Sequence, residues 1–191
     1  GGVCSADQIA LAGKGELDVL FLLGADEYDM SAMGKAFVVY IGSHGDAGAH
    51  RADVILPGAT YTEKSGTYVN TEGRVQMANR AAFAPGEARE DWAILRALSD
   101  VLGHRLPFDS LNALRAKLYA AHPHFAAIDR IAPADVGAAV QALAGIGGTP
   151  GREPFVSPIK DFYLTNPIAR ASGVMAECSA LAHERRLEAA E

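Results

Sequence analysis

The sequence predicts an α/β protein built on a small parallel sheet with flanking helices, followed by a polar β-hairpin and an extended helical C-terminal tail. Three observations lead to this fold class. Residues 17–23, 36–41 and 53–56 are short apolar runs enriched in β-branched and aromatic residues. The connections between them are short and rich in Gly. Segments with helical apolar spacing lie before and after them, as expected for helices packed on a parallel sheet.

The first two predicted elements are a helix and a buried strand. The helix covers about residues 5–14, and we expect Ser5 to open it with Gln8 completing a capping box. Residues 17–23 are almost unbroken in apolar character, which is typical of a strand covered on both faces. Gly24 ends this strand.

Helical spacing returns after the hairpin, between residues 87 and 103. Glu90 and Asp91 suit the first turn of a helix, and Gly103 suits a left-handed cap at its end. The apolar positions on one face are Trp92, Leu95, Leu98 and Leu102, and we expect Trp92 in the core.

Two further helices are predicted before the chain becomes rich in Gly and Pro. The first begins with Asp109 as N-cap and ends before Pro123, so His122 and His124 are expected in a surface turn. A shorter helix is expected over residues 135–144.

The predicted domain organisation has three parts. Residues 1–144 form part of an α/β domain, 145–158 form a Gly- and Pro-rich linker, and 159–191 form a helical docking tail. Asn166 and Pro167 provide an N-cap followed by proline at the first helical position. A helix beyond a linker cannot bury its apolar side alone, so we expect it to dock on another subunit or, as the alternative, on the parent domain.

Composition excludes several classes of partner. The 191 residues include 49% hydrophobic and 21% charged residues, as in ordinary globular proteins. A net charge of −6 argues against binding to nucleic acid or anionic lipid. The longest apolar run, residues 19–25, is too short to cross a bilayer, so we expect no direct membrane insertion. Because no initiator Met is present, we expect a fragment or a processed portion of a longer protein.

Residues 50–76 are the richest in candidate chemistry, since they combine the end of a strand with a polar hairpin. The carboxyl ends of strands in open α/β sheets are the usual ligand sites. Residues 58–65 resemble a phosphate-binding loop, but Glu63 would place a carboxylate against the phosphates. Gly42, Gly45 and Gly48 do not have the spacing of the dinucleotide fingerprint, so we predict a turn-rich loop there.

The same region resembles a known family. The segment ADVILPGATYTEKSGTYVNTEGRVQ is similar to the signature of the molybdopterin oxidoreductase superfamily. Within it, TEKSGTYVNTEGRVQ, REDWAILRALSDVLG and PIKDFYLTNPIARAS resemble, in the same order, the large iron–sulfur subunit family of respiratory NADH:quinone oxidoreductase, complex I. The resemblance covers about residues 17–175 and implies a molybdopterin oxidoreductase-like, Rossmann-like α/β domain.

The resemblance implies candidate ligand positions in the hairpin turn and in the first strand loop. In enzymes of the superfamily the hairpin lies near the pterin, so Asn70, Glu72 and Arg74 are candidates for binding it. The alternative is that these residues hydrogen-bond the turn and pair across it, as expected if the domain resembles a complex I subunit without a pterin. The first loop, residues 24–29, contains three acidic residues, which would repel phosphates unless a metal or an Arg lay between them.

Metal and thiol chemistry has little support in the sequence. Cys4 and Cys178 are the only cysteines, and iron–sulfur clusters or structural zinc usually need four ligands, so two free thiols are expected. His44, Asp46 and His50 could form a metal site, but their spacing matches no usual zinc pattern. We therefore assign no catalytic, cofactor-binding or metal-binding residue.

The resulting functional hypothesis is a non-catalytic structural and assembly portion of the complex I large iron–sulfur subunit. The resemblance implies that the parent subunit holds 4Fe–4S and 2Fe–2S clusters, that the parent complex holds FMN, and that electrons pass from NADH to quinone. The implied partners are other hydrophilic-arm subunits, including the flavin-binding subunit. The implied location is peripheral, on the cytoplasmic side of the bacterial inner membrane or the matrix side of the mitochondrial one. The alternative is a pterin-binding fragment of an active molybdenum or tungsten oxidoreductase such as a formate dehydrogenase.

Overall fold

The computed structural model describes residues 2–131, 136–149, 151–157 and 159–188, and its architecture is α/β as predicted. The described elements, in chain order, are α1 (Ser5–Lys14), β1 (Val19–Leu23), η1 (Met30–Met33), β2 (Phe37–Gly42), α2 (Ala47–Arg51), β3 (Val54–Pro57), β4 (Gly66–Val69), β5 (Val75–Ala78), α3 (Asp91–Val101), α4 (Leu111–Ala121), η2 (Pro123–Ala126), α5 (Val136–Ala144), α6 (Pro167–Arg170) and α7 (Gly173–Glu188). Here η denotes a 3₁₀ helix.

The chain forms two compact units. The first contains Gly1–Lys64, Arg80–Pro107 and Ile159–Glu191, and therefore joins the C-terminal helices to the parallel sheet. The second contains Ser65–Asn79 and Phe108–Pro158. The predicted boundaries at residues 144 and 158 stay a prediction.

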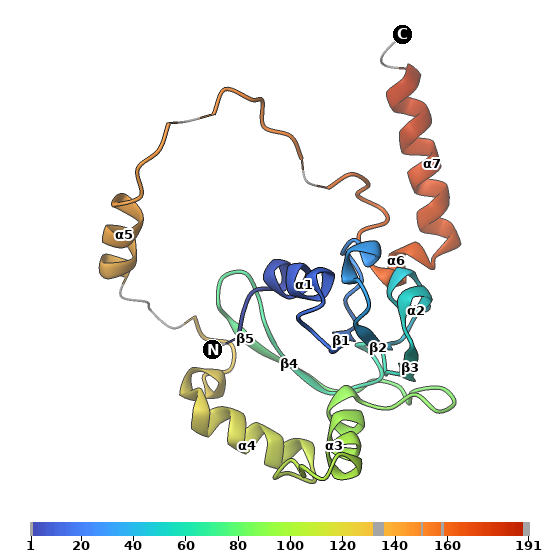
Figure 1. The fold of residues 1–191 in the computed structure, drawn as a ribbon, viewed down its shortest axis with the longest axis vertical. Coiled ribbons are helices and arrows are strands. Elements are labelled where there is room, and N and C mark those ends of the chain that lie inside the picture. Colours follow the sequence, from blue (N-terminus) through green and yellow to red (C-terminus); the bar gives the residue numbers. More distant parts are fainter. Residues whose placement is uncertain (1, 132–135, 150, 158, 189–191) are drawn as a thin grey trace. The chain divides into compact units, whose positions relative to one another are not determined.

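A three-stranded parallel sheet is the centre of the first unit, with the order β1-β2-β3 (Figure 1). Val19 pairs with Phe37, and Val39 pairs with Val54. Because all three strands point the same way, the loops that follow them gather at one edge of the sheet. Asp53 helps to set this register, since its carboxylate accepts from the Val38 backbone N–H at 2.8 Å.

The core lies on one face of this sheet. The buried cluster comprises Leu20, Leu22, Met33, Val38 and Tyr40, and it is extended by Ile9, Met30, Ala49 and Ala52. These residues come from α1, η1, α2 and the strands, so all three short helices contribute to the same apolar layer. Burial of this layer provides the main stabilisation of the unit.

The expectation that β1 is covered on both faces is wrong for this chain. Val19, Phe21 and Leu23 are 38–49% exposed, whereas Leu20 and Leu22 are buried. β1 is at the end of the strand order, and the core cluster packs on its Leu20 side only. The alternation is hidden in the sequence because the outward positions are also apolar.

Two predicted helix starts need correction. α1 begins at Ser5, but Cys4 is the N-cap and the Gln8 side chain donates to the Val3 carbonyl, so no capping box forms. In the second unit, α4 begins one residue later than predicted, with the Ser110 hydroxyl accepting from the Ala113 N–H at 3.1 Å. Ser and Asp are both good caps, and only the local backbone geometry decides between neighbours.

α3 forms where predicted, but its expected core face is not buried in this chain. Trp92 is only half-buried and its indole N–H donates to the Glu90 carboxylate, while Leu102 is 61% exposed. The buried residues of α3 are Arg96 and Ser99. Gly103 adopts φ 73°, as expected of a left-handed cap.

The short helices are the features that the sequence patterns did not predict or merged. η1 and α2 were not predicted, and the loop predicted around Gly48 contains the five-residue α2. The tail starts as expected, with the Asn166 side chain accepting from the Ala169 N–H, but it breaks at Ala171 into α6 and α7. The helix expected over 135–144 is α5, and residue 135 lies outside the described residues.

Candidate functional site

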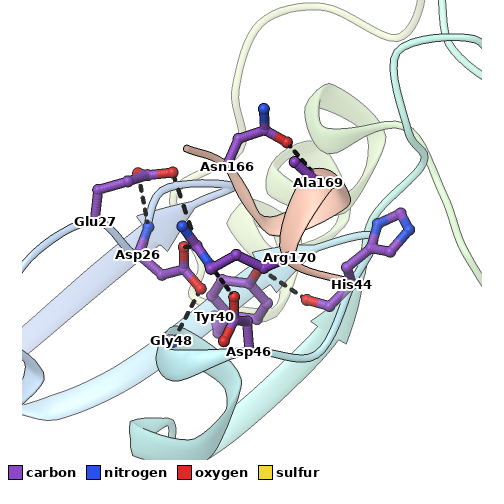
Figure 2. A network of polar contacts seen from close by, with 9 residues as sticks. All are labelled: Asp26, Glu27, Tyr40, His44, Asp46, Gly48, Asn166, Ala169 and Arg170. Atoms are coloured by element: carbon purple, nitrogen blue, oxygen red, sulfur yellow. Dashed lines mark hydrogen bonds and ion pairs between the residues drawn. The ribbon is translucent and has the colours of Figure 1, made fainter. Parts of the chain in front are cut away.

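The loops after β1 and β2 bring two carboxylates to the carboxyl edge of the sheet. Asp26 follows β1 and Asp46 follows β2, and Glu27 lies beside them (Figure 2). We call these three residues the acidic socket. This edge is where ligands bind in open α/β sheets, so the socket lies at the position that the fold makes available for chemistry.

Asp26 is the deepest member of the socket. Its side chain is 0% exposed, and one carboxylate oxygen accepts from the Gly48 N–H at 3.3 Å. Its own backbone N–H donates to the Glu27 carboxylate at 3.2 Å. A carboxylate removed from water in this way needs a counter-charge, because desolvation otherwise costs several kcal/mol, in order of magnitude.

Gly48 permits the close approach of α2 to this carboxylate. A Cβ at this position would lie 2.8 Å from the Tyr40 ring and 2.9 Å from the Asp26 Cβ. Tyr40 is buried below the socket, and its hydroxyl donates to the His44 carbonyl at 3.0 Å. Burial raises the pKa of Tyr40, and the nearby Asp26 charge raises it further.

The counter-charge comes from Arg170 at the end of α6. Its Nη2 binds an Asp26 oxygen and its Nε binds an Asp46 oxygen, while Glu27 lies 4.0 Å away. The hydrogen bond from Arg170 holds the pKa of Asp46 below its ordinary value of 3.8. The sequence indicates that an Arg or a metal has to lie among these acidic residues. It does not indicate which Arg, because 144 residues separate Arg170 from Asp26.

The suggested metal trio is divided among other contacts. Asp46 is paired with Arg170, and the His44 ring Nδ1 lies 2.9 Å from the Ser43 hydroxyl. His50 is exposed on α2. Across the part of the chain that the structure describes, no three His, Cys, Asp or Glu side chains gather closely enough to hold a metal ion.

The segment that resembles a phosphate loop is a turn closed by its own carboxylate. Glu63 accepts from the Thr60 N–H at 3.0 Å, and its N–H donates back to the Thr60 carbonyl at 2.9 Å. Lys64, which would contact phosphate in such a loop, pairs with Asp91 of α3. A cavity of about 350 Å³ lies beside this turn, and its lining includes the carboxylates of Glu63 and Glu87.

The hairpin of the second unit joins β4 and β5 as an antiparallel pair through the predicted turn. The Asn70 side chain accepts from the N–H groups of Glu72 and Arg74, both at 3.0 Å, and Gly73 adopts φ 82°. Arg74 lies 3.6 Å from the Glu72 carboxylate and donates to the Asp129 carbonyl at 2.9 Å. The three candidate pterin ligands therefore make the contacts of the structural alternative. Their pterin binding itself stays untested.

The two cysteines lie on different helices. Cys4 is exposed at the N-cap of α1, and its thiol lies 3.2 Å from the Asp7 carboxylate. Cys178 is half-buried on α7. Two thiols cannot supply the four ligands that an iron–sulfur cluster usually needs.

Residues 2–101, just over half of the chain, match the family model described as molybdopterin oxidoreductase. The chain belongs to the molybdopterin oxidoreductase family. Residues 130–178 of this family member match a second model, which describes the C-terminal part of the G-type chain of NADH-ubiquinone oxidoreductase. The predicted order of motifs therefore follows a family boundary between the sheet and the tail.

Curated relatives of this molybdopterin oxidoreductase family member are NADH dehydrogenase subunits. It is 48% identical over 169 residues to the NADH-ubiquinone oxidoreductase 78 kDa subunit of Neurospora crassa, covering 84% of this chain and 22% of the relative. It is 44% identical over 168 residues to the 75 kDa subunit of Reclinomonas americana, covering 88% and 24%. It is 42% identical over 163 residues to NADH dehydrogenase [ubiquinone] iron-sulfur protein 1 of Solanum tuberosum, covering 85% and 22%.

These likenesses confirm the predicted resemblance to the large iron–sulfur subunit of complex I and do not favour the formate dehydrogenase alternative. The chain spans about a quarter of the length of these relatives.

The molybdopterin cofactor implied by the family name does not fit the donor set of the carboxyl edge. A pterin dinucleotide presents phosphates, which need backbone N–H groups or cationic side chains. Here the socket presents Asp26, Glu27 and Asp46, and the cation among them, Arg170, is already bound to two carboxylates. The neighbouring cavity adds the carboxylates of Glu63 and Glu87. No reaction step through a pterin follows from these residues.

Proposed function

We propose that this chain is a non-catalytic structural and assembly portion of the large iron–sulfur subunit of NADH:quinone oxidoreductase, complex I. The observation that supports this most directly is the occupation of the carboxyl-edge crevice by Arg170, in a chain 42–49% identical to complex I subunits. A crevice filled by the chain's own side chain has a structural use instead of a catalytic one.

The parent complex, in this proposal, passes electrons from NADH to quinone. The relatives' names describe an iron–sulfur protein of an NADH–ubiquinone oxidoreductase, which supports 4Fe–4S and 2Fe–2S clusters in the parent subunit and FMN in the parent complex. Cluster potentials depend on solvent exposure and on nearby charges. A folded domain that excludes water and fixes the positions of its charges would therefore help to maintain them.

The proposed partners are the other hydrophilic-arm subunits of the complex, including the flavin-binding subunit. The exposed apolar side chains of β1 and the partly exposed α7 offer surfaces for such contacts. Among the described residues, no helix is both long enough and apolar enough to span a bilayer. The proposed location is peripheral, on the cytoplasmic side of the bacterial inner membrane or the matrix side of the mitochondrial one.

The proposed division of labour along the chain follows the sequence. Residues 1–144 belong to the α/β domain, 145–158 are the linker, and 159–191 are the docking tail. The placement of Ile159–Glu191 in the same compact unit as the sheet supports docking of the tail on the parent domain. Its remaining surface is available to another subunit.

Metal and pterin analysis of the purified intact complex tests the proposal. The expected result is iron in the amount that the clusters require, with molybdenum, tungsten and pterin at background. Stoichiometric molybdenum or tungsten that copurifies with the subunit would contradict the proposal and support the oxidoreductase alternative. A matched preparation of a known molybdenum enzyme shows that the extraction recovers pterin.

A further inference from the structure

The contacts of Arg170 form a site with a defined chemical preference. Two nitrogens of one planar guanidinium reach carboxylates from two different loops, Nη2 to Asp26 after β1 and Nε to Asp46 after β2 (Figure 2). A planar fork can bind both at once, whereas an ammonium ion is a point charge with no such geometry. The acidic socket is therefore shaped for a guanidinium group.

The burial of Asp26 explains why a cation is needed at this position. Its side chain is 0% exposed, and its neighbours include the buried Tyr40 and the backbone of Gly48. One backbone N–H at 3.3 Å only partly replaces the water that this carboxylate has lost. The Arg170 side chain is 25% exposed, so the site is open to solvent from the side on which the guanidinium enters.

The segment that bears Arg170 is built to present it. Asn166 caps α6 by accepting from the Ala169 N–H at 3.0 Å, and Pro167 fixes the first helical residue. After Arg170 the chain turns at Ala171 and continues into α7. Asp161 braces the base of α7 by accepting from the Ser179 hydroxyl. A four-residue helix thus aims one side chain at the sheet while the next helix departs from it.

We infer that the acidic socket is a guanidinium-binding site filled in cis, and that Arg170 is the anchor that fastens α6 and the start of α7 to the carboxyl edge of the sheet. The anchor joins the segment matched by the NADH-ubiquinone oxidoreductase model to the segment matched by the molybdopterin oxidoreductase model. It uses the position at which this fold usually accepts an external ligand. The inference does not rest on the proposed role in complex I.

The test is the exchange of backbone amides in residues 166–178, measured in the full subunit within its native assembly. Arg170→Ala is expected to raise their exchange rates by at least about tenfold, because it frees the segment and leaves a buried carboxylate unpaired. Ethylguanidinium added at non-denaturing concentration is expected to restore much of the protection, and ethylammonium is expected to restore little. Arg170→Lys is expected to give an intermediate rate.

Arg89→Ala is the matched control, since Arg89 is an exposed arginine that pairs with Glu87 two residues away. It is expected to leave exchange in residues 166–178 unchanged. Unchanged exchange in Arg170→Ala would overturn the inference, and so would equal rescue by ethylammonium and ethylguanidinium.

A second variant covers the case in which Arg170→Ala fails to accumulate. Adding Asp26→Asn removes the unpaired buried charge, so the double variant is expected to accumulate while the amides of residues 166–178 stay unprotected. Normal protection of these amides in the double variant would show that apolar packing holds the segment, and would overturn the inference. Metal or pterin content is unaffected by these substitutions, so failure of this inference and failure of the proposed function give different results.

Discussion

The acidic socket and the hairpin turn were both candidate ligand sites, and they are stabilised in different ways. In the turn, Asn70 accepts from N–H groups two and four residues away, and the participating residues are mostly exposed. In the socket, a buried carboxylate is neutralised by an arginine 144 residues away. Damage to the turn should therefore stay local, whereas damage to the socket should separate parts of the chain that are distant in sequence.

Asp26→Asn should have the largest effect of the substitutions that sharpen this comparison. The amide keeps an acceptor for Gly48 but loses the charge that binds Arg170, so the free energy of unfolding should fall by about 2 kcal/mol. Denaturant unfolding of the purified subunit measures this. Glu87→Gln, which removes an exposed carboxylate paired with Arg89, should change it by less than about 0.5 kcal/mol. Equal losses in both variants would remove the distinction between buried and exposed pairs.

Gly48→Ala should come next. The added methyl meets the Tyr40 ring and the Asp26 Cβ, so overpacking should cost about 1–3 kcal/mol despite the better helix propensity of Ala. Gly45→Ala is the matched control, because nothing lies within 4 Å of a Cβ there. Thermal unfolding of the two variants in parallel checks the difference. A neutral Gly48→Ala would mean that α2 can move away from the socket at little cost.

Asn70→Ala should have a smaller and confined effect. It removes the acceptor for the Glu72 and Arg74 N–H groups in an exposed turn, at a cost of about 1 kcal/mol. Amide exchange should accelerate in residues 70–74 and remain unchanged in residues 24–29 and 166–178. Faster exchange in those distant residues would contradict the claim that the hairpin is a local structure.

Acidification should weaken the socket by the smallest amount. The pKa of Asp46 is lowered by its hydrogen bond from Arg170, so its contribution is fully present above the ordinary value of 3.8 and is lost as the pH falls through the lower folded value. Protection of the α6 amides should decline in that acidic range. Asp46→Asn should flatten this decline, and an unchanged pH profile in that variant would assign the effect to another group.

The sequence predicted the elements whose signals are local. Three β-branched runs gave the strands of the parallel sheet, and the Asn70 to Gly73 turn formed as expected between β4 and β5. The Asn166-Pro167 pair marked the start of α6, because capping depends on residues only three positions apart. The motif blocks were specific enough to predict the family, which the comparisons confirmed.

Other features were outside the reach of local signals. The neighbouring caps Asp109 and Ser110 have similar propensities, and α2 is too short to produce a helical period. The outward side of β1 is as apolar as its inward side, so exposure could not be read from the pattern. Sequence alone also indicated that the acidic loop needed a cation without indicating its source.

The sequence by itself therefore determined the order of the strands along the chain, the turn chemistry of the hairpin and the need for positive charge beside Asp26. Only the tertiary structure decided that Arg170 supplies it, that Gly48 must lack a side chain and that one side of β1 stays exposed. The physical reason is range. Backbone propensities and caps act over a few residues, whereas the pairing of a buried charge is decided by which distant segment reaches it when the chain folds.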